Sequence, residues 1–508
     1  MEAFIGLAVL AALAAWALKH AFDKTGLSPL LGIFGGALWR FFQPLSFLRP
    51  NEGAKFLGGL DGWRLVNPSN GGLVVDGDRG RLTEDDSFRH LVLVAPPGAG
   101  KTTRYIVPNV LQLDGCSMLV TDPSGSVWKR TSGDLRRRGF DVKVLNLADP
   151  SRSVGYNPMA KVRTALQASD LAKTLVASSA GSSGKDAAFW NQGAEYLIDA
   201  IVETLAAPDY AAAHPEHVNL HNVLHLAMAY GRSDRAVDAF IERRGTAAAI
   251  RMWAAATAGK TSVVQIYQST ATNVLGMLAQ PEIASLLSRD ELDFREMRRR
   301  KTALFVVVPE DRIESYAFVL NLLYAQSFGA WMEGDPDSRD LPVYVLADEF
   351  GHSSIPRFSA IINNIRKYRV SVSMVLQAVS QLDLRYGKDA GETILGGANA
   401  RMVMGGADLR TTTWFEKMAG RTRYRTYDEM GPRKAVEENL INADRIRTLG
   451  DDQALLLFAN KEPALLRTTP YFRNGRLDRL TKAAPWNPAA GRGPAALSYV
   501  DLKEYAQR

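Results

Sequence analysis

The sequence predicts an α/β protein with a parallel sheet that is covered on both faces and interrupted by a helical insertion. Eight short runs rich in Val and Leu recur along the chain, and each run is continuously apolar. Continuous runs are typical of parallel strands buried on both faces, whereas strands with one solvated face alternate apolar and polar residues. With 46% hydrophobic and 23% charged residues, the chain of 508 residues has a globular composition and can bury a large core.

The predicted strands lie on either side of a long stretch that has no strand pattern. From about residue 151 to residue 293 the chain is rich in Ala, Leu and Gln at helical spacing. Strand patterns on both sides of this stretch favour an all-α domain inserted into one α/β domain. The eight predicted strands are residues 91–95, 117–122, 142–147, 302–309, 343–348, 370–376, 400–405 and 454–459.

The first 50 residues differ from the rest of the chain. Residues 3–18 carry no charge, and a second apolar stretch at 27–48 contains Arg40 and Pro44. At 1.5 Å per residue the first run reaches about 24 Å against roughly 30 Å of hydrocarbon, so it can span a bilayer with tilt or local thinning. A cleaved secretory signal is the alternative, but the chain begins Met-Glu rather than with basic residues. The pattern predicts a retained membrane anchor, either one span or a hairpin.

Charge and cysteine content bear on the compartment and the partners. Lys and Arg number 61 against 54 Asp and Glu, a net charge of +7, which permits a polyanionic partner without establishing one. The single cysteine, Cys116, cannot form an intramolecular disulfide or a cysteine zinc cluster, which favours a reducing cytoplasm for the bulk of the chain. The seven His residues show no HExxH or similar spacing, so we expect no structural metal.

Residues 90–103, HLVLVAPPGAGKTT, carry the strongest chemical signal. A strand that ends in a Gly-rich loop and continues into Lys-Thr at a helix start is the geometry that wraps a triphosphate. Lys101 is expected to reach the β and γ oxygens, and the Thr102 hydroxyl to ligate Mg²⁺. The pattern GxxxxGK[ST] requires glycine at position 95, where this chain has Ala95. The residues expected to bind the nucleotide are Pro97, Gly98, Ala99, Gly100, Lys101, Thr102 and Thr103.

A pair of carboxylates follows a later predicted strand. In VYVLADEF, Asp348 can hold the Mg²⁺ shell and Glu349 can orient and activate water, although an Asp-Glu pair at a strand exit also serves as a helix cap. Gln377 ends the next predicted strand, where its amide is either a contact to the γ-phosphate or attacking water, or an ordinary polar strand end. Because NKEP at 460–463 departs from the guanine motif NKxD, ATP is the expected nucleotide.

Further motifs occur in a fixed order along the chain. They are APPGAGKTT, TDPSGS at 121–126, GYNP at 155–158, FWNQGAEYLIDAI from Phe189, ADEF at 347–350, LQAVSQL at 376–382 and LINADRIRTLGDDQALLLFANKEP at 440–463. In this order they resemble the motifs of the TraG-type coupling ATPases of type IV secretion and conjugation systems. The resemblance covers most of the chain from about Arg89 to Pro463, with an apolar N-terminus in the expected place.

The resemblance implies a RecA-like, hexameric ATPase anchored in the bacterial inner membrane, with the bulk of the chain in the cytoplasm. Its all-α domain would recruit single-stranded DNA with its relaxase, or protein effectors, for delivery to the type IV secretion channel. The predicted segments are a membrane anchor at 1–50, a nucleotide-binding domain at 51–150 and 294–470, an all-α domain at 151–293 and a flexible tail at 471–508.

The resemblance also implies roles for individual residues. Lys101 and Thr102 would bind ATP and Mg²⁺, and Asp348 and Glu349 would be the Mg²⁺-coordinating and water-activating carboxylates. Gln377 would be the glutamine that couples the nucleotide state to movement. Arg366 lies where the family places an arginine that reaches a neighbouring subunit's ATP, with Lys367 and Arg369 as competing candidates and an exposed helix cation as the alternative. The chain departs from the family at Ala95 and in DPSGS, which lacks the Lys and Glu often found after that Asp-Pro.

Two other functions stay open at this stage. The first is a substrate-receptor hub, in which the nucleotide controls assembly and there is little motor activity. The second is a translocase of duplex DNA, although nothing after Pro463 resembles a sequence-reading module. Basic clusters at 136–138 and 298–301 stand where helix C-terminal cations are expected, and this structural interpretation is favoured over nucleic-acid contact.

Overall fold

The computed structural model describes residues 52–179, 187–232, 235–335, 337–428, 431–486 and 496–506. The predicted anchor at 1–50 lies outside these residues, and among the helices that are described none is long and apolar enough to cross a bilayer. The described chain divides into two units. The smaller contains 52–54, 421–428 and 431–438, and the larger contains the remaining residues.

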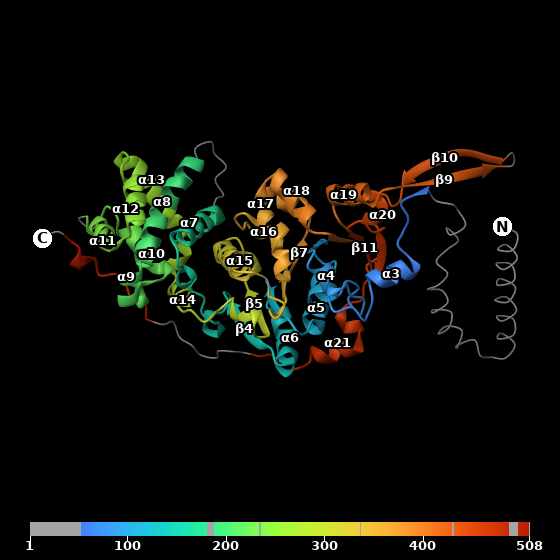
Figure 1. Cartoon of the computed structure of the whole chain (residues 1–508), viewed down its shortest axis with the longest axis horizontal. Coiled ribbons are helices and arrows are strands. Elements are labelled where there is room, and N and C mark those ends of the chain that lie inside the picture. Colours follow the sequence, from blue (N-terminus) through green and yellow to red (C-terminus); the bar gives the residue numbers. More distant parts are fainter. Residues whose placement is uncertain are drawn as a thin grey trace. The chain divides into compact units, whose positions relative to one another are not determined.

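The smaller unit is a three-stranded sheet with the order β1-β9-β10. It consists of β1 (Glu52–Gly53), β9 (Arg421–Asp428) and β10 (Gly431–Asn439), whose last residue is assigned to the larger unit. β1 pairs antiparallel with β9, with Glu52 opposite Arg423, and β9 and β10 form the hairpin in Figure 1. These strands were not predicted, because their residues are largely charged and polar.

The larger unit is built on a nine-stranded sheet with the order β12-β11-β8-β2-β7-β6-β3-β5-β4. All eight predicted strands are present. From β8 to β4 every neighbouring pair is parallel, whereas β11 is antiparallel to both β8 and β12. The strands are β2 (Leu91–Val94), β3 (Ser117–Thr121), β4 (Asp141–Asn146), β5 (Thr302–Val307), β6 (Val343–Ala347), β7 (Val370–Leu376), β8 (Ala400–Met404), β11 (Gln453–Phe458) and β12 (Ala464–Arg467).

Both faces of this sheet are buried, as the continuous apolar runs predicted. Leu91 and Leu93 belong to one hydrophobic core and Val92 and Val94 to the other, because successive side chains point to opposite faces of a strand. The first core includes side chains of η2 (Thr102–Ile106), α5 (Val107–Gln112) and α6 (Ser126–Arg137). The second includes side chains of α15 (Ala317–Trp331), α16 (Phe358–Asn364) and α19 (Leu409–Ala419).

Strand order determines where a site can form. β2 lies between β7 and β8, and β6 and β3 follow β7. Since these strands are parallel, the loops that follow β2, β7, β6 and β3 emerge at the same edge of the sheet, which is the edge that binds ligands in open α/β folds. The shorter helices of this part are α3 (Gly59–Leu65), α4 (Glu84–Ser87), α17 (Ser380–Tyr386), α18 (Lys388–Gly397) and α20 (Ala443–Arg447).

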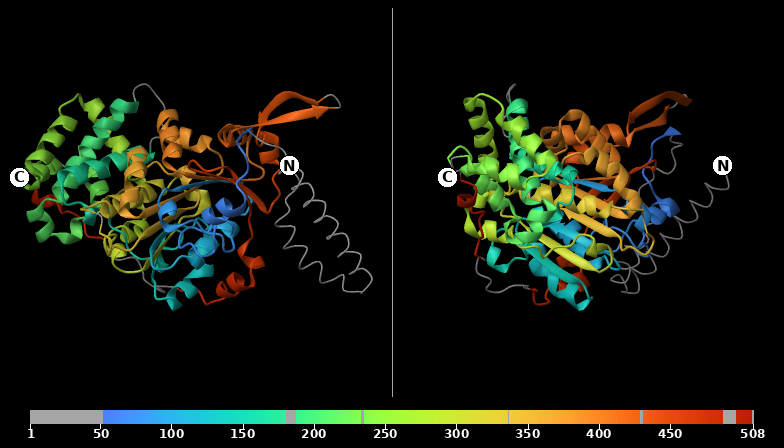
Figure 2. Two further views of the ribbon diagram at one scale, coloured as in Figure 1. Left: turned by 45° about the vertical axis from the view of Figure 1, so that its right-hand side comes forward. Right: turned by 60° about the vertical axis from the view of Figure 1, so that its left-hand side comes forward.

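Between β4 and β5 the described residues form helices and no strand, and these helices group together in Figures 1 and 2. α8 packs against α7, α12 and α13. Gly193 permits one close approach, because a Cβ there would lie 2.2 Å from the Tyr267 ring. The helices are α7 (Ala165–Ser179), α8 (Ala187–Leu205), α9 (Pro208–Ala213), α10 (Leu220–Ala229), α11 (Ala236–Arg244), α12 (Ala247–Thr257), α13 (Thr261–Val274) and α14 (Pro281–Leu286).

The C-terminal segment differs from the flexible tail predicted at 471–508. It contains η11 (Tyr471–Arg473) and α21 (Gly475–Leu480), and Leu477 is fully buried. Residues 496–506 lie against the helical domain (Figure 2), where the Val500 N–H donates to Asn222 Oδ1 at 3.1 Å and Tyr505 is buried. A few apolar anchors and backbone hydrogen bonds hold the segment, so its low apolar content was a poor guide.

Candidate nucleotide-binding site

The loop between β2 and η2 has the conformation that its glycines allow. Gly98 and Gly100 have φ angles of 81° and 87°, which L-residues with a side chain rarely adopt. At Gly100 a Cβ would also lie 2.8 Å from Arg104 Nε. These two glycines therefore turn the chain sharply after the strand and bring Lys101 to the start of the following helix.

Ala95 does not disturb the loop. It is absent from the positive-φ positions, it is fully buried, and its N–H donates to the Leu376 carbonyl at 3.0 Å. Ala95 therefore extends the pairing of β2 with β7 by one residue, in a conformation that any residue can adopt. The loop therefore does not need glycine at position 95, because Gly98 and Gly100 make the turn.

The helix after the loop begins with one wide turn. The Val107 N–H donates to the Thr102 carbonyl five residues earlier, and Pro108 has no N–H to donate to Arg104. The first turn of this helix and the loop before it offer backbone N–H groups at the edge of the sheet, the usual place for phosphate binding. Lys101 and Thr102 project from this turn.

The structure brings the predicted carboxylates and glutamine to Lys101 and Thr102. Lys101 Nζ lies 2.6 Å from Glu349 Oε1, and the Thr102 hydroxyl donates to Asp348 Oδ2 at 3.0 Å. Gln377 Nε2 donates to Glu349 Oε2 at 2.9 Å. Residues from three adjacent strand ends therefore form one hydrogen-bonded group.

The environment of Asp348 is that of a carboxylate suited to bind a cation. Burial raises the pKa of its carboxyl, and the nearby Lys101 charge and the Thr102 hydroxyl act in the opposite direction. Its Oδ1 atom is buried and has no hydrogen-bond partner. A buried carboxylate oxygen without a partner is costly unless a ligand satisfies it. Oxygen ligands from a carboxylate and a hydroxyl fit Mg²⁺, so Asp348 and Thr102 are suited to hold the ion that accompanies a nucleotide.

The sequence singled out no role for Asp122, yet it lies beside this group. It follows β3 directly, in register with Asp348 after β6, because Thr121 pairs with Ala347. Burial raises the pKa of Asp122 to about 6, and the charge of Asp348 adds to the rise. The carboxylate is oriented by the Trp128 N–H, which donates to Oδ2 at 2.8 Å. Asp122 adds negative potential at the position where a cation is expected.

Gln381 was also missed. Its Oε1 accepts the Gln377 N–H at 2.8 Å, and it packs so closely on Gly351 that a Cβ at that position would lie 2.4 Å from its Cδ. Glu349 has a φ of 57°, an uncommon conformation for a residue other than glycine. The turn that carries Glu349 and Gly351 is thus locked to the loop that carries Gln377.

Arg366 does not lie in this group. It is exposed in η10 (Ile365–Tyr368), before the first residue of β7, whereas Gln377 follows the last. Seven residues of strand place the two about 23 Å apart. Of the competing cations, Arg369 pairs with Glu84 at 2.6 Å and Lys367 lies over its neighbour Tyr368.

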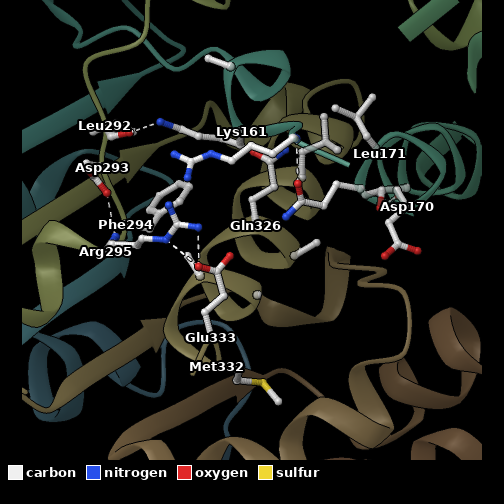
Figure 3. A pocket seen from close by; sticks show the side chains of 18 of the residues that line it. Lys161, Asp170, Leu171, Leu292, Asp293, Phe294, Arg295, Gln326, Met332 and Glu333 are labelled. Atoms are coloured by element: carbon white, nitrogen blue, oxygen red, sulfur yellow. Dashed lines mark hydrogen bonds and ion pairs between the residues drawn. The ribbon is translucent and has the colours of Figure 1, made fainter. Parts of the chain in front are cut away.

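A separate cavity of about 820 Å³ lies between the helical domain and the helices α15 and α16. Figure 3 shows its lining, in which Arg295 donates to Glu333 at 2.6 Å. Lys161, which also lines the cavity, pairs with Asp290 at 2.7 Å. Because these charges pair within the chain, the cavity is better explained as a junction between two parts of the larger unit than as a nucleotide site.

The basic clusters serve structural roles. Arg138 pairs with Asp134 at 3.0 Å at the end of α6 and donates to two backbone carbonyls, and Arg136 lies 3.9 Å from the centre of the Trp486 ring. Lys301 pairs with Asp114 at 3.0 Å. These contacts agree with the favoured interpretation of the clusters.

A glycine loop after a central strand, a lysine and threonine at the following helix, and a strand-end acid pair define a P-loop nucleotide-binding protein. Residues 65–490 match the model of the family described as type IV secretory system conjugative DNA transfer, so the chain belongs to that family. This confirms the resemblance stated from the motifs.

Individual relatives agree with this assignment. The chain is 23% identical over 407 residues to Protein VirD4 of Rhizobium radiobacter, covering 77% of this chain and 58% of that protein. For Protein VirD4 of Rhizobium rhizogenes the identity is also 23%, with 77% and 60% covered. The chain thus spans about 60% of the length of these relatives.

Solved structures show that the fold is shared. The bacterial conjugative coupling protein TrwBdeltaN70 in an unbound form has a TM-score of 0.66 at 17% identity, covering 86% of this chain and 95% of that one. The plasmid coupling protein TrwB in complex with ADP and Mg²⁺ has a TM-score of 0.66 at 18% identity, covering 84% and 96%. The α/β nucleotide-binding fold expected from the motifs is therefore confirmed.

Proposed function

We propose that this protein is an ATPase that couples nucleotide hydrolysis to the delivery of DNA or protein substrates to a type IV secretion channel. Membership of the conjugative DNA transfer family supports the class of cargo, and the nucleotide-bound TrwB structure supports the ligand class. The observation that carries the proposal is the hydrogen-bonded group of Lys101, Glu349 and Gln377 beside Thr102 and Asp348.

Lys101 and Glu349 form a closed pair, with side-chain exposures of 9% and 18%. A triphosphate that enters the loop competes for the lysine, because its β and γ oxygens carry more negative charge than one carboxylate. When Lys101 turns to the phosphates, Glu349 loses its cation and can accept a proton from, or orient, the attacking water. Gln377 keeps hold of the other carboxylate oxygen and so fixes the direction in which Glu349 faces.

Magnesium bound with the nucleotide would neutralise charge on the β- and γ-phosphates. The Thr102 hydroxyl and Asp348 Oδ1 would hold it, which would satisfy the buried oxygen that has no partner. Asp122, on the neighbouring strand end, would attract the ion by keeping the local electrostatic potential negative. These residues belong to three different loops, so loss of any one should affect metal use more than folding.

Arg366 lies at the opposite end of β7 from Gln377, so any role in hydrolysis must be exerted on another copy. We place it against the ATP of a neighbouring subunit in a ring, with a hexamer as the expected assembly. In nucleotide hydrolases, an arginine supplied by a neighbouring protein raises kcat by roughly 10³- to 10⁵-fold. Arg369 is the weaker candidate, because Glu84 and two backbone carbonyls already engage its guanidinium.

Residues 1–50 are proposed as the anchor in the bacterial inner membrane, with the sheet and helical domain on the cytoplasmic side. The helices between β4 and β5 are proposed as the surface that recruits cargo, either a relaxase attached to single-stranded DNA or a protein effector. Contacts to DNA would go mainly to phosphates, which makes binding independent of sequence and sensitive to salt.

The test is ATP turnover by the full-length chain, with and without single-stranded DNA, across a series of protein concentrations. Turnover per chain should rise with protein concentration and with DNA, and the DNA effect should fall steeply as salt is raised. Lys101→Ala should abolish turnover, while the matched control Lys129→Ala, which removes an exposed cation of α6, should not.

A flat response to both DNA and concentration would favour the receptor hub over a motor. Cargo capture that is undiminished in Glu349→Gln would point the same way. Turnover that survives Lys101→Ala would remove the proposed site altogether.

A further inference from the structure

Three side chains converge on the surface of the helical domain, far from the nucleotide loops in the sequence. His214 follows α9, and Glu216 and His217 belong to the short turn η5 (Pro215–His217). His214 Nδ1 lies 3.6 Å from Glu216 Oε1, and His217 Nε2 lies 3.7 Å from the same oxygen. The three ligand atoms all lie within 4.8 Å of one another, and no second group of three is as close among the residues that the structure describes.

A hydrogen bond to the ring nitrogen that does not face Glu216 orients the imidazole of His217. The Tyr210 hydroxyl lies 2.8 Å from His217 Nδ1, and Tyr210 itself is buried, with 4% of its surface exposed. A phenol oxygen that accepts the Nδ1 proton leaves the Nε2 lone pair directed at Glu216. A hydrogen bond to the second ring nitrogen is what metal-binding histidines have in proteins, where it fixes the tautomer and the ring direction.

The backbone also holds the group in shape. The His214 N–H donates to the Tyr210 carbonyl at 2.8 Å, and the His217 N–H donates to the His214 carbonyl at 3.0 Å. Pro215 begins η5 and fixes φ between the two histidines. The two imidazole rings are nearly parallel, at 12°, with centres 5.1 Å apart. The backbone therefore loses little conformational freedom when the three ligands close on an ion.

We propose that His214, Glu216 and His217 bind one divalent transition-metal ion, with Zn²⁺ as the representative ion. Two imidazole nitrogens and one carboxylate oxygen form a ligand set that suits zinc and its neighbours and does not suit Mg²⁺ or Ca²⁺, which take oxygen ligands. Three ligands leave a fourth position for water or for a side chain of a partner. The expectation of no structural metal rested on the absence of HExxH-like spacings, and the proposed site uses a different spacing, His-Pro-Glu-His.

The required closing movement is small. Metal–ligand bonds of about 2.1 Å in a tetrahedron place the ligand atoms about 3.4 Å apart. The two histidine–glutamate distances exceed this by a few tenths of an ångström, and the two histidine nitrogens lie within 4.8 Å of each other. Side-chain rotation of exposed Glu216 and half-buried His214 can supply the difference. An ion pair between Glu216 and protonated imidazoles would also hold the atoms together, and the experiment must separate the two states.

The site lies beside the C-terminal segment. The Tyr210 ring lies 5.3 Å from Phe240, and Phe240 lies 5.2 Å from Tyr505, so the ring that orients His217 also packs into the cluster that anchors the chain end. Metal binding is therefore expected to stabilise the turn after α9 together with residues 496–506, as a single local unit.

The test is isothermal titration of Zn²⁺ into the full-length chain, prepared without a histidine tag and freed of metal by a chelator. We expect one Zn²⁺ per chain, abolished by His214→Ala and by Glu216→Gln. The matched control Asp209→Asn removes a neighbouring exposed carboxylate of α9 that takes no part in the group, so it should leave binding unchanged. Tyr210→Phe removes only the hydroxyl and should weaken binding by roughly 10- to 100-fold.

A second readout separates a built site from casual binding. Co²⁺ should give the intense visible absorption of a tetrahedral complex in the parent chain and in Asp209→Asn, and not in Glu216→Gln. The proposal is overturned by an absence of saturable binding, by a stoichiometry that His214→Ala leaves intact, or by equal losses in Glu216→Gln and Asp209→Asn. Binding unaffected by Tyr210→Phe also contradicts it, because the hydrogen bond to His217 is part of the proposed site.

Discussion

Glu349→Gln should separate nucleotide binding from nucleotide hydrolysis. Lys101 donates a hydrogen bond to Glu349, and this contact must break before the lysine can reach a phosphate. Glutamine keeps the shape but offers one acceptor oxygen in place of two, and it lacks both the negative charge and the basicity. The substitution therefore removes a competitor of the nucleotide and the proposed base at the same time.

The expected magnitudes follow from the 2.6 Å pair, whose two side chains are mostly buried. Hydrogen bonds to charged groups are worth about 1.5–3 kcal/mol, with the lysine–carboxylate bond near the top of this range and a lysine–amide bond near the bottom. Replacing the first by the second lowers the cost of releasing Lys101 by about 1 kcal/mol, which tightens nucleotide binding by about fivefold. Loss of a general base lowers kcat by about 10²- to 10⁴-fold.

Titration calorimetry with a non-hydrolysable ATP analogue and Mg²⁺ measures the affinity, and phosphate release measures kcat. Glu392→Gln removes an exposed carboxylate of α18 and serves as the matched control, with neither quantity changed. The reasoning is refuted if Glu349→Gln weakens the analogue as much as Lys101→Ala does. It is equally refuted if hydrolysis in Glu349→Gln stays within twofold of the parent chain.

Three further substitutions test other parts of the structure. Gln381→Ala removes the hydrogen bond that holds the Gln377 loop. It should lower kcat on the order of 10- to 100-fold and leave the affinity for the ATP analogue unchanged. Steady-state turnover measures kcat and calorimetry measures the affinity; a change in affinity alone would contradict the prediction. Arg366→Ala chains should be inactive by themselves but should regain ATP turnover when they are mixed with Lys101→Ala chains. Lys367→Ala chains should stay active. A mixture that shows no recovery argues against Arg366 acting on the ATP of a neighbouring subunit. Asp199, buried in α8 with one oxygen unpartnered, has its pKa raised by burial to about 6. The unfolded chain therefore loses this proton first as pH rises from about 4 to about 6, and the native state is weakened by up to about 3 kcal/mol above that range. Asp199→Asn should raise stability in urea at pH 7.5 and have little effect at pH 4, and equal effects at both pH values would contradict the assignment.

Local sequence patterns predicted the centre of the fold well. β2, β6 and β7 are fully buried and rich in Val, and burial on both faces leaves this signature in the sequence. Lys101 and Thr102 were predictable for a related reason, because the phosphate loop is continuous in the chain. The strand-end position of Asp348 and Glu349 follows from parallel strands whose carboxyl ends share one edge of the sheet.

The features that escaped prediction depend on contacts between distant segments. The edge strand β12 alternates buried and exposed residues over only four positions, so its pairing with β11 is decided by the sheet and not by its own pattern. Gln381 acquires its position only because Gly351, thirty residues earlier, leaves room for it. Residues 496–506 are held by partners such as Asn222, which no local composition reveals.

His214, Glu216 and His217 illustrate a different limit. The three lie close together in the sequence, with Glu216 two residues after His214 and His217 directly after Glu216. This spacing fits neither one face of a helix nor one face of a strand. Only the turn that Pro215 begins brings the ligand atoms together, and only the fold of α9 puts Tyr210 behind His217.

A structure of the chain with Mg²⁺ and a non-hydrolysable ATP analogue is the most direct test of the proposed site. Lys101 Nζ should have left Glu349 and lie within hydrogen-bond distance of a γ-phosphate oxygen, with Asp348 and Thr102 on the metal side. An intact Lys101–Glu349 pair at saturating analogue would contradict the assignment.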